Sequence, residues 1–248
     1  MDQLSHEKIY VDGIPVYVTR PVRDTGKAVI LYHGWSSSAL SQRARALLFA
    51  VSGYTVYAPD ALHHGERQPL SDYYTPSVYS LFWDTIEQNM KESEQLIRFV
   101  RKRGGRQIFL SGHSMGGMSV LGIAYVHAEE LCGVVSFNGS GDWLLTHLFI
   151  QARFGVYMGE AEPRFSFIRD SSPLSHAEKL LQLPLFLTNG EADVSIDKRA
   201  QLHFVQVLEG KKGAVTHTIY PLLGHFVTTN MMDDAIIWMD EVSERNPR

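Results

Sequence analysis

Apolar segments alternate with longer segments of helical periodicity along most of the 248-residue chain. The apolar segments are rich in β-branched and aromatic residues, and each is followed by a turn. This alternation predicts βαβ units and an α/β fold with a mostly parallel sheet. Several segments are apolar at nearly every position, so we expect their strands to be covered on both faces. The six clearest predicted strands are 27–32, 54–58, 107–111, 133–137, 183–188 and 214–220.

Other patterns predict an N-terminal hairpin and four helices. Residues 8–20 (KIYVDGIPVYVTR) resemble two strands that turn near Asp12-Gly13. A long helix is expected from Asp84 to Arg103, because Asp84 followed by Glu87 matches a capping box. A second helix is predicted to begin at Met115. The third and fourth predicted helices span 196–208 and 230–242.

Residues 140–176 interrupt the alternation and carry many aromatic side chains. A connection of this length is seldom a bare loop, so we expect a small helical lid insertion. Its aromatic residues form either a small core of their own or part of a substrate pocket. Trp143 is the candidate for the pocket wall.

Composition favours one globular domain over residues 1–248 and excludes several classes of protein. Hydrophobic residues make up 44% of the chain and charged residues 20%, which excludes disordered, collagen-like and coiled-coil proteins. The net charge of −4 leaves no cationic surplus for nucleic-acid binding. We therefore expect a small-molecule substrate as the partner, and the sequence leaves monomer and homodimer open.

Cysteine usage and the lack of long apolar runs predict a cytoplasmic protein without a membrane partner. Cys132 is the only cysteine, which excludes intrachain disulfides and cysteine-based zinc sites. The polar start MDQLSHEK lacks the order of a secretory signal. No apolar run approaches the roughly 18 residues of a membrane span.

The strongest chemical motif is Gly112-His113-Ser114-Met115-Gly116-Gly117, which fits Gly-x-Ser-x-Gly. It follows the predicted strand 107–111 directly and opens a predicted helix, so Ser114 is expected on a sharp nucleophile elbow. Gly112 and Gly116 would permit the close backbone approach that this turn needs.

A serine nucleophile needs a general base and an acid that orients it. On folds with this elbow the order is serine, acid, histidine. His225, in YPLLGHF after the last predicted strand, is the expected base. Asp193 is the expected acid, with Glu191 and Asp197 as alternatives in the same turn.

Acyl transfer also needs donors for the developing oxyanion. The backbone amide of Met115 and that of Trp35, in His33-Gly34-Trp35-Ser36, are the candidates for this oxyanion hole. The indole of Trp35 either walls the pocket or packs beneath it. Candidate substrate contacts are His33, Gly34, His64, His113 and Trp143.

A polar cluster of His63, His64, Glu66 and Arg67 admits three interpretations. It could form a structural loop, contact the substrate or bind a metal. Adjacent histidines point to opposite sides of an extended chain, and hydrolysis by a triad needs no metal. We therefore expect neither a metal nor a cofactor.

Further motifs give a resemblance to the α/β-hydrolase superfamily over nearly the whole chain. Ser-Met-Gly-Gly-Met with Leu121-Gly122, and Pro59-Asp60-Ala61 followed by His64-Gly65 and Arg67, look like small carboxylesterases. These enzymes are related to dienelactone hydrolases and to the catalytic domain of prolyl oligopeptidases. The resemblance implies Ser114 as nucleophile, Asp193 as acid and His225 as base, and helices flanking a mostly parallel sheet. Residues 140–176 match no pattern of that group.

The sequence thus predicts a serine hydrolase that cleaves carboxylic esters through an acyl-enzyme on Ser114. Short acyl chains are expected, because a small insertion encloses a small pocket. A thioesterase, an acyl transferase or a small peptidase would use the same triad. A ligand-binding or sensing module on the same fold, or an interaction protein with an incidental elbow, is the alternative of another class.

Overall fold

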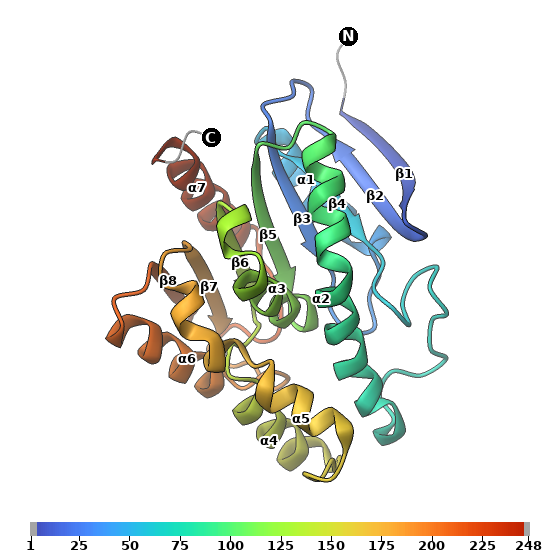
Figure 1. Cartoon of the computed structure of the whole chain (residues 1–248), viewed down its shortest axis with the longest axis vertical. Coiled ribbons are helices and arrows are strands. Elements are labelled where there is room, and N and C mark those ends of the chain that lie inside the picture. The colour runs from blue at the N-terminus through green and yellow to red at the C-terminus, as the bar shows by residue number, and fades with distance from the viewer. Residues whose placement is uncertain (1–3, 246–248) are drawn as a thin grey trace.

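The computed structural model describes residues 4–245, and an eight-stranded sheet lies at its centre (Figure 1). The strand order is β1-β2-β4-β3-β5-β6-β7-β8. β2 pairs antiparallel with both β1 and β4, whereas all pairs from β4 to β8 are parallel. The mostly parallel sheet predicted from the sequence is therefore confirmed. The strands are β1 (Ser5–Val11), β2 (Ile14–Arg20), β3 (Lys27–Tyr32), β4 (Thr55–Pro59), β5 (Gln107–His113), β6 (Gly133–Phe137), β7 (Leu185–Gly190) and β8 (Val215–Tyr220).

The hairpin turns where the sequence predicts it. Asp12 and Gly13 have φ angles of 47° and 86°, and a two-residue type I′ turn needs positive φ at both positions. Val11 then pairs with Ile14, and this register places alternate side chains of β2 against the core.

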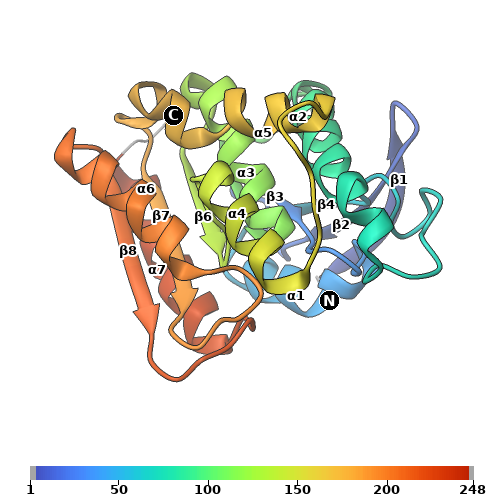
Figure 2. The ribbon, with the colours of Figure 1, turned by 90° about the horizontal axis from the view of Figure 1, so that it is seen from below.

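Helices cover both faces of the sheet (Figure 2). Side chains of α1 and α7 pack on one face, and those of α2, α3 and α6 pack on the other. Within residues 4–245, no helix has the length and apolar character needed to cross a bilayer. The helices are α1 (Arg43–Val51), α2 (Tyr79–Lys102), α3 (Met115–Val126), α4 (Trp143–Phe154), α5 (Pro163–Asp170), α6 (Lys198–Gly210) and α7 (Thr229–Arg245), with 3-10 helices at Leu40–Gln42, Pro76–Val78, Ala128–Glu130 and Pro173–Leu180.

The predicted start of the long helix at Asp84 is wrong, because α2 already begins at Tyr79 after a 3-10 turn that opens with Pro76. Asp84 and Glu87 therefore lie inside the helix, on one face, three residues apart. Both carboxylates pair with Arg164 of α5. A capping-box pattern in the sequence thus marks an ion-pair site between two helices.

Residues 140–176 are largely helical, as the sequence predicts, and contain α4 and α5. α4 and α5 lie at the lower end of the molecule in Figure 1, beyond the carboxyl end of β5. α4 ends at Phe154 and is followed by Gly155, whose φ of 64° is the left-handed conformation common after a helix C-terminus. This placement brings the segment close to the strand end that carries Ser114.

Candidate active site

Ser114 lies at the junction of β5 and α3 in a conformation that non-glycine residues seldom adopt. Its φ and ψ are 58° and −120°, and such a conformation costs free energy that the surrounding packing must supply. A Cβ atom on Gly112 would come within 2.2 Å of the Gly116 carbonyl oxygen, and one on Gly116 within 2.3 Å of the Tyr32 oxygen. The glycines are thus required by the close approach of strand, turn and helix.

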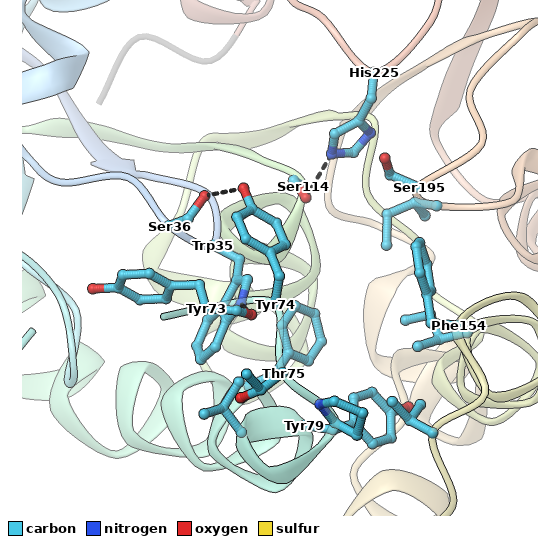
Figure 3. Close-up of a pocket in the computed structure, with 16 residues that line it drawn as sticks. Trp35, Ser36, Tyr73, Tyr74, Thr75, Tyr79, Ser114, Phe154, Ser195 and His225 are labelled. Carbon is cyan, nitrogen blue, oxygen red and sulfur yellow. Dashed lines mark hydrogen bonds between the residues drawn. The ribbon is translucent and has the colours of Figure 1, made fainter. Parts of the chain in front are cut away.

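A chain of hydrogen bonds links Ser114, His225 and Asp193. The Ser114 hydroxyl lies 2.8 Å from His225 Nε2 (Figure 3), and His225 Nδ1 lies 2.6 Å from Asp193 Oδ2. The other Asp193 oxygen accepts hydrogen bonds from the amides of Ser195 and Ile196. The Asp193 side chain is fully buried, whereas that of His225 is 22% exposed. The imidazole is thereby held with one nitrogen toward the serine and within reach of a substrate.

The two alternative acids have other partners. Glu191 accepts a hydrogen bond from the amide of Leu222. Asp197 caps α6 through the amide of Arg199 and forms an ion pair with that side chain. The structure therefore brings Asp193, and neither alternative, to His225.

Two backbone amides beside Ser114 are positioned as candidate oxyanion donors. Met115 is the first residue of α3, so its amide is one of those that a helix leaves unpaired. Trp35 follows Gly34, where a Cβ atom would lie 3.4 Å from the Ser114 Cβ. No residue in the range 4–245 accepts a hydrogen bond from either amide. The N-terminus of α3 also places positive dipole potential at this point.

A cavity of about 340 Å³ opens at Ser114 and His225 (Figure 3). Trp35 forms part of its wall, and the indole donates a hydrogen bond to the Tyr73 carbonyl. The rest of the wall comes from the loop before α2, the start of α2, the end of α4 and the turn after Asp193. Phe154 belongs to the aromatic residues of 140–176 for which the sequence left a pocket role open. The remaining lining residues were not predicted: Ser36, Tyr73, Tyr74, Thr75, Pro76, Val78, Tyr79, Phe82, Ile150, Val156, Ser195 and Ile196.

The cavity lining does not include His33, Gly34 or His64, so the cavity lends no support to their prediction as substrate contacts. His33 Nδ1 donates to the Gly34 carbonyl, and its Nε2 accepts from the Ala61 amide. His64 Nδ1 donates to the Leu62 carbonyl, and its Nε2 accepts from the Ser36 amide at 3.2 Å. Burial lowers the pKa of each imidazole to about 4. Both histidines thus support, as neutral imidazoles, the loop that carries Trp35.

His113 and Trp143 also do not line the cavity. The His113 ring lies 4.8 Å from the His225 ring, and burial together with the neighbouring His225 holds its pKa well below the ordinary value. Trp143 is fully buried and packs against Trp83 and Phe167. The segment 140–176 therefore contributes both to a core, through Trp143, and to the cavity, through Ile150, Phe154 and Val156.

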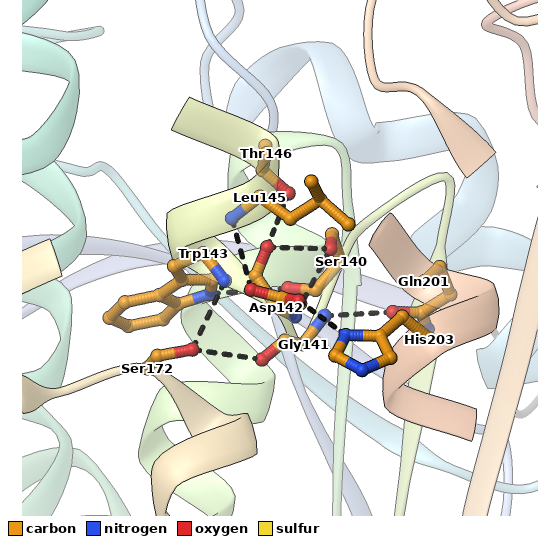
Figure 4. A network of polar contacts seen from close by, with 9 residues as sticks. All are labelled: Ser140, Gly141, Asp142, Trp143, Leu145, Thr146, Ser172, Gln201 and His203. Atoms are coloured by element: carbon orange, nitrogen blue, oxygen red, sulfur yellow. Dashed lines mark hydrogen bonds and ion pairs between the residues drawn. The ribbon is translucent and has the colours of Figure 1, made fainter. Parts of the chain in front are cut away.

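Polar contacts fix the start of this segment to α6 (Figure 4). Asp142 caps α4 by accepting from the Leu145 amide, and its second oxygen lies 2.7 Å from His203 Nδ1. The Gly141 amide donates to the Gln201 side chain. α6 follows the Asp193 turn, so one helix supports both the acid turn and the segment that lines the cavity.

The polar cluster around His63 has structural partners. The His63 carbonyl accepts from the Tyr73 hydroxyl, Glu66 pairs with Lys8, and Arg67 pairs with Glu92. In the described part of the chain, no three histidine, cysteine, aspartate or glutamate side chains are grouped as metal ligands would be. The arrangement fits the structural interpretation of the cluster.

Comparisons with known proteins agree with the fold described above. Residues 28–231 match the model of the alpha/beta hydrolase family. The chain is 29% identical over 235 residues to Esterase YjfP of Escherichia coli (strain K12), an alignment that covers 90% of this chain and 93% of the relative. Its fold is similar to that of TT1662 from Thermus thermophilus, with a TM-score of 0.76 and 21% identity over 97% of this chain and 98% of the other. It is also similar to a highly thermostable carboxyl esterase from Bacillus coagulans, with a TM-score of 0.69 and 14% identity over 98% and 99%.

Proposed function

Because the chain belongs to the alpha/beta hydrolase family, we propose that this hydrolase is a serine esterase with Ser114, His225 and Asp193 as its catalytic triad. The observation that carries the proposal is the hydrogen-bond chain from the Ser114 hydroxyl through His225 to Asp193, at a strained elbow. Similarity to an esterase over 90% of the chain supports carboxylic esters as the substrates.

In this mechanism His225 acts in turn as general base and general acid. His225 Nε2 takes the Ser114 proton while the oxygen attacks the ester carbonyl, and Asp193 stabilises the resulting imidazolium. The amides of Trp35 and Met115 donate to the oxyanion of the tetrahedral intermediate. His225 then protonates the departing alcohol, which leaves an acyl group on Ser114. Water, activated by the same imidazole, hydrolyses this acyl-enzyme.

Labelling with a fluorophosphonate probe tests the nucleophile directly. We expect a stoichiometric adduct that mass mapping places on Ser114, and no adduct in Ser114→Ala or His225→Ala. Hydrolysis of p-nitrophenyl butyrate should fall by at least about 10⁴-fold in either variant. Ser166→Ala is the control, because Ser166 is an exposed serine that does not line the cavity. An adduct that persists in Ser114→Ala would refute the proposal.

A further inference from the structure

The cavity is larger than a short-chain ester requires. A cavity of about 150 Å³ can hold benzene, so the cavity of about 340 Å³ has room for roughly a dozen non-hydrogen atoms. A butyryl group together with a small alcohol would leave much of this space unfilled. The short acyl chains expected from the sequence would therefore fill only part of the cavity.

The cavity wall is mostly apolar, and its described part carries no carboxylate, lysine or arginine side chain. Among the described lining residues there is no Asp, Glu, Lys or Arg. A charged acyl group would lose its hydration without gaining an ionic partner, which is costly. Uncharged groups are therefore favoured.

Aromatic side chains concentrate on one side of Ser114. In Figure 3, Trp35, Tyr73 and Tyr74 lie on the side of Ser114 away from His225. The Trp35 ring meets the rings of Tyr73 and Phe82 edge-on, at centroid distances of 5.1 and 5.6 Å. We call Trp35, Tyr73, Tyr74 and Phe82 the aromatic lobe. Its rings offer both faces and edges to an apolar group that enters.

The opposite side of Ser114 carries fewer rings. Figure 3 shows Phe154 and Ser195 on the side where His225 lies. Because His225 must protonate the departing alkoxide, the alcohol part of the ester has to lie on this side. The acyl part then points toward the aromatic lobe.

We propose that the aromatic lobe binds an uncharged, apolar acyl group larger than butyryl, of about six to nine carbon atoms and best when it carries a ring. The side formed by Phe154 and Ser195 receives the alcohol. This inference rests on the proposed esterase function, and it assigns specificity to Tyr74 for the acyl group and to Phe154 for the alcohol.

Two exposed side chains allow the assignment to be tested without disturbing the core. Tyr74 is 81% exposed and Phe154 is 55% exposed, so Tyr74→Ala and Phe154→Ala should both fold. Each variant is the control for the other. A set of esters that share one acyl group forms the same acyl-enzyme, so the rate of deacylation depends on the acyl side alone.

The wild-type enzyme should hydrolyse p-nitrophenyl 3-phenylpropanoate with a kcat/KM at least about 10-fold above that of the butyrate, since each buried methylene adds about fourfold. A p-nitrophenyl hemisuccinate should react at least about 100-fold more slowly than the phenylpropanoate. Tyr74→Ala should reduce the preference for phenylpropanoate about fivefold and change the deacylation rate. Phe154→Ala should keep the preference for phenylpropanoate and the deacylation rate. It should reduce only the discrimination between large and small alcohols.

Three results would overturn the inference. The wild-type enzyme could hydrolyse the butyrate as fast as the phenylpropanoate or faster, or it could hydrolyse the hemisuccinate as fast as the phenylpropanoate. In the third result, Tyr74→Ala changes the alcohol discrimination and Phe154→Ala changes the acyl preference. Fluorophosphonate labelling of the same samples separates this failure from failure of the esterase proposal. An adduct on Ser114 with a preference for butyrate refutes the acyl assignment only. Absence of an adduct refutes both.

Discussion

His64 controls the backbone of the oxyanion loop without touching the cavity. Its Nε2 accepts the Ser36 amide at 3.2 Å, and Ser36 has a φ of 59°, which a non-glycine residue seldom adopts. The ring also meets the Trp35 indole edge-on at 4.8 Å. Because Trp35 directly precedes Ser36, we expect this hydrogen bond to restrict the backbone that orients the Trp35 amide. His64 is therefore a positioning residue.

Replacement of His64 should lower kcat more than it raises KM. In His64→Leu the Ser36 amide loses its acceptor, and we expect kcat on p-nitrophenyl butyrate to fall about 10-fold or more, because the loss of one oxyanion donor costs about 10²–10³-fold. His64→Gln keeps an acceptor oxygen and should recover most of this loss. The infrared carbonyl frequency of the acyl-enzyme should rise in the leucine variant only. An equal loss in both variants would show a merely structural role.

The proposed catalytic residues were more predictable than the cavity wall for a physical reason. Ser114 follows β5 directly, and Asp193 and His225 lie in the loops just after β7 and β8, so local patterns and the order along the chain were enough to select them. The cavity wall combines Tyr74 and its neighbours with Phe154, about 80 positions away. Only the packing of α4 against the rest of the molecule brings these together. Two local signals pointed to parts of the wall: the aromatic residues of 140–176, among them Phe154, and the aromatic run YYTPSVY, which the sequence analysis did not use.

At the scale of helices, Arg164 links the segment 140–176 to α2. Its guanidinium pairs with both Asp84 and Glu87, and all three side chains are about one quarter exposed. Partial burial and two acceptors make this contact stronger than a single surface ion pair, for which the median is about 0–1 kcal/mol. The same pair of carboxylates had suggested a helix start. Sequence spacing alone cannot distinguish a capping box from two carboxylates that share an ion-pair partner on one helix face. In both cases the two side chains are three positions apart.

Arg164→Met should loosen α5 while the rest of the fold keeps its stability. We expect amide hydrogen exchange in Pro163–Asp170 to become about fivefold faster, which corresponds to about 1 kcal/mol, with little change in the core strands. Arg169→Met is the matched control on the same helix, because Arg169 pairs with its exposed neighbour Asp170. Equal acceleration in both variants, or acceleration throughout the sheet, would contradict this role for Arg164.

For the whole molecule, buried neutral histidines predict a loss of stability in mild acid. Burial lowers the pKa of His33 and His64 from 6.5 to about 4. Between these pH values the unfolded chain binds protons that the folded chain does not, so the free energy of unfolding falls as the pH drops from 6.5 toward 4. Above pH 6.5 the stabilisation is fully present. A difference of about 2.5 pH units corresponds to at most about 3 kcal/mol for each imidazole.

Urea unfolding at several pH values between 4.5 and 7.5 measures this dependence, and variants separate it from the titration of carboxylates. His64→Gln removes one of the buried imidazoles, so the slope of unfolding free energy against pH should become shallower, even where the variant is less stable at pH 7. His6→Gln replaces an exposed histidine and should leave the slope unchanged. A protonated His64 would no longer accept the Ser36 amide, so the same titration that weakens the fold also releases the oxyanion loop. Identical slopes in the wild type and His64→Gln would show that His64 does not stay neutral in the folded protein.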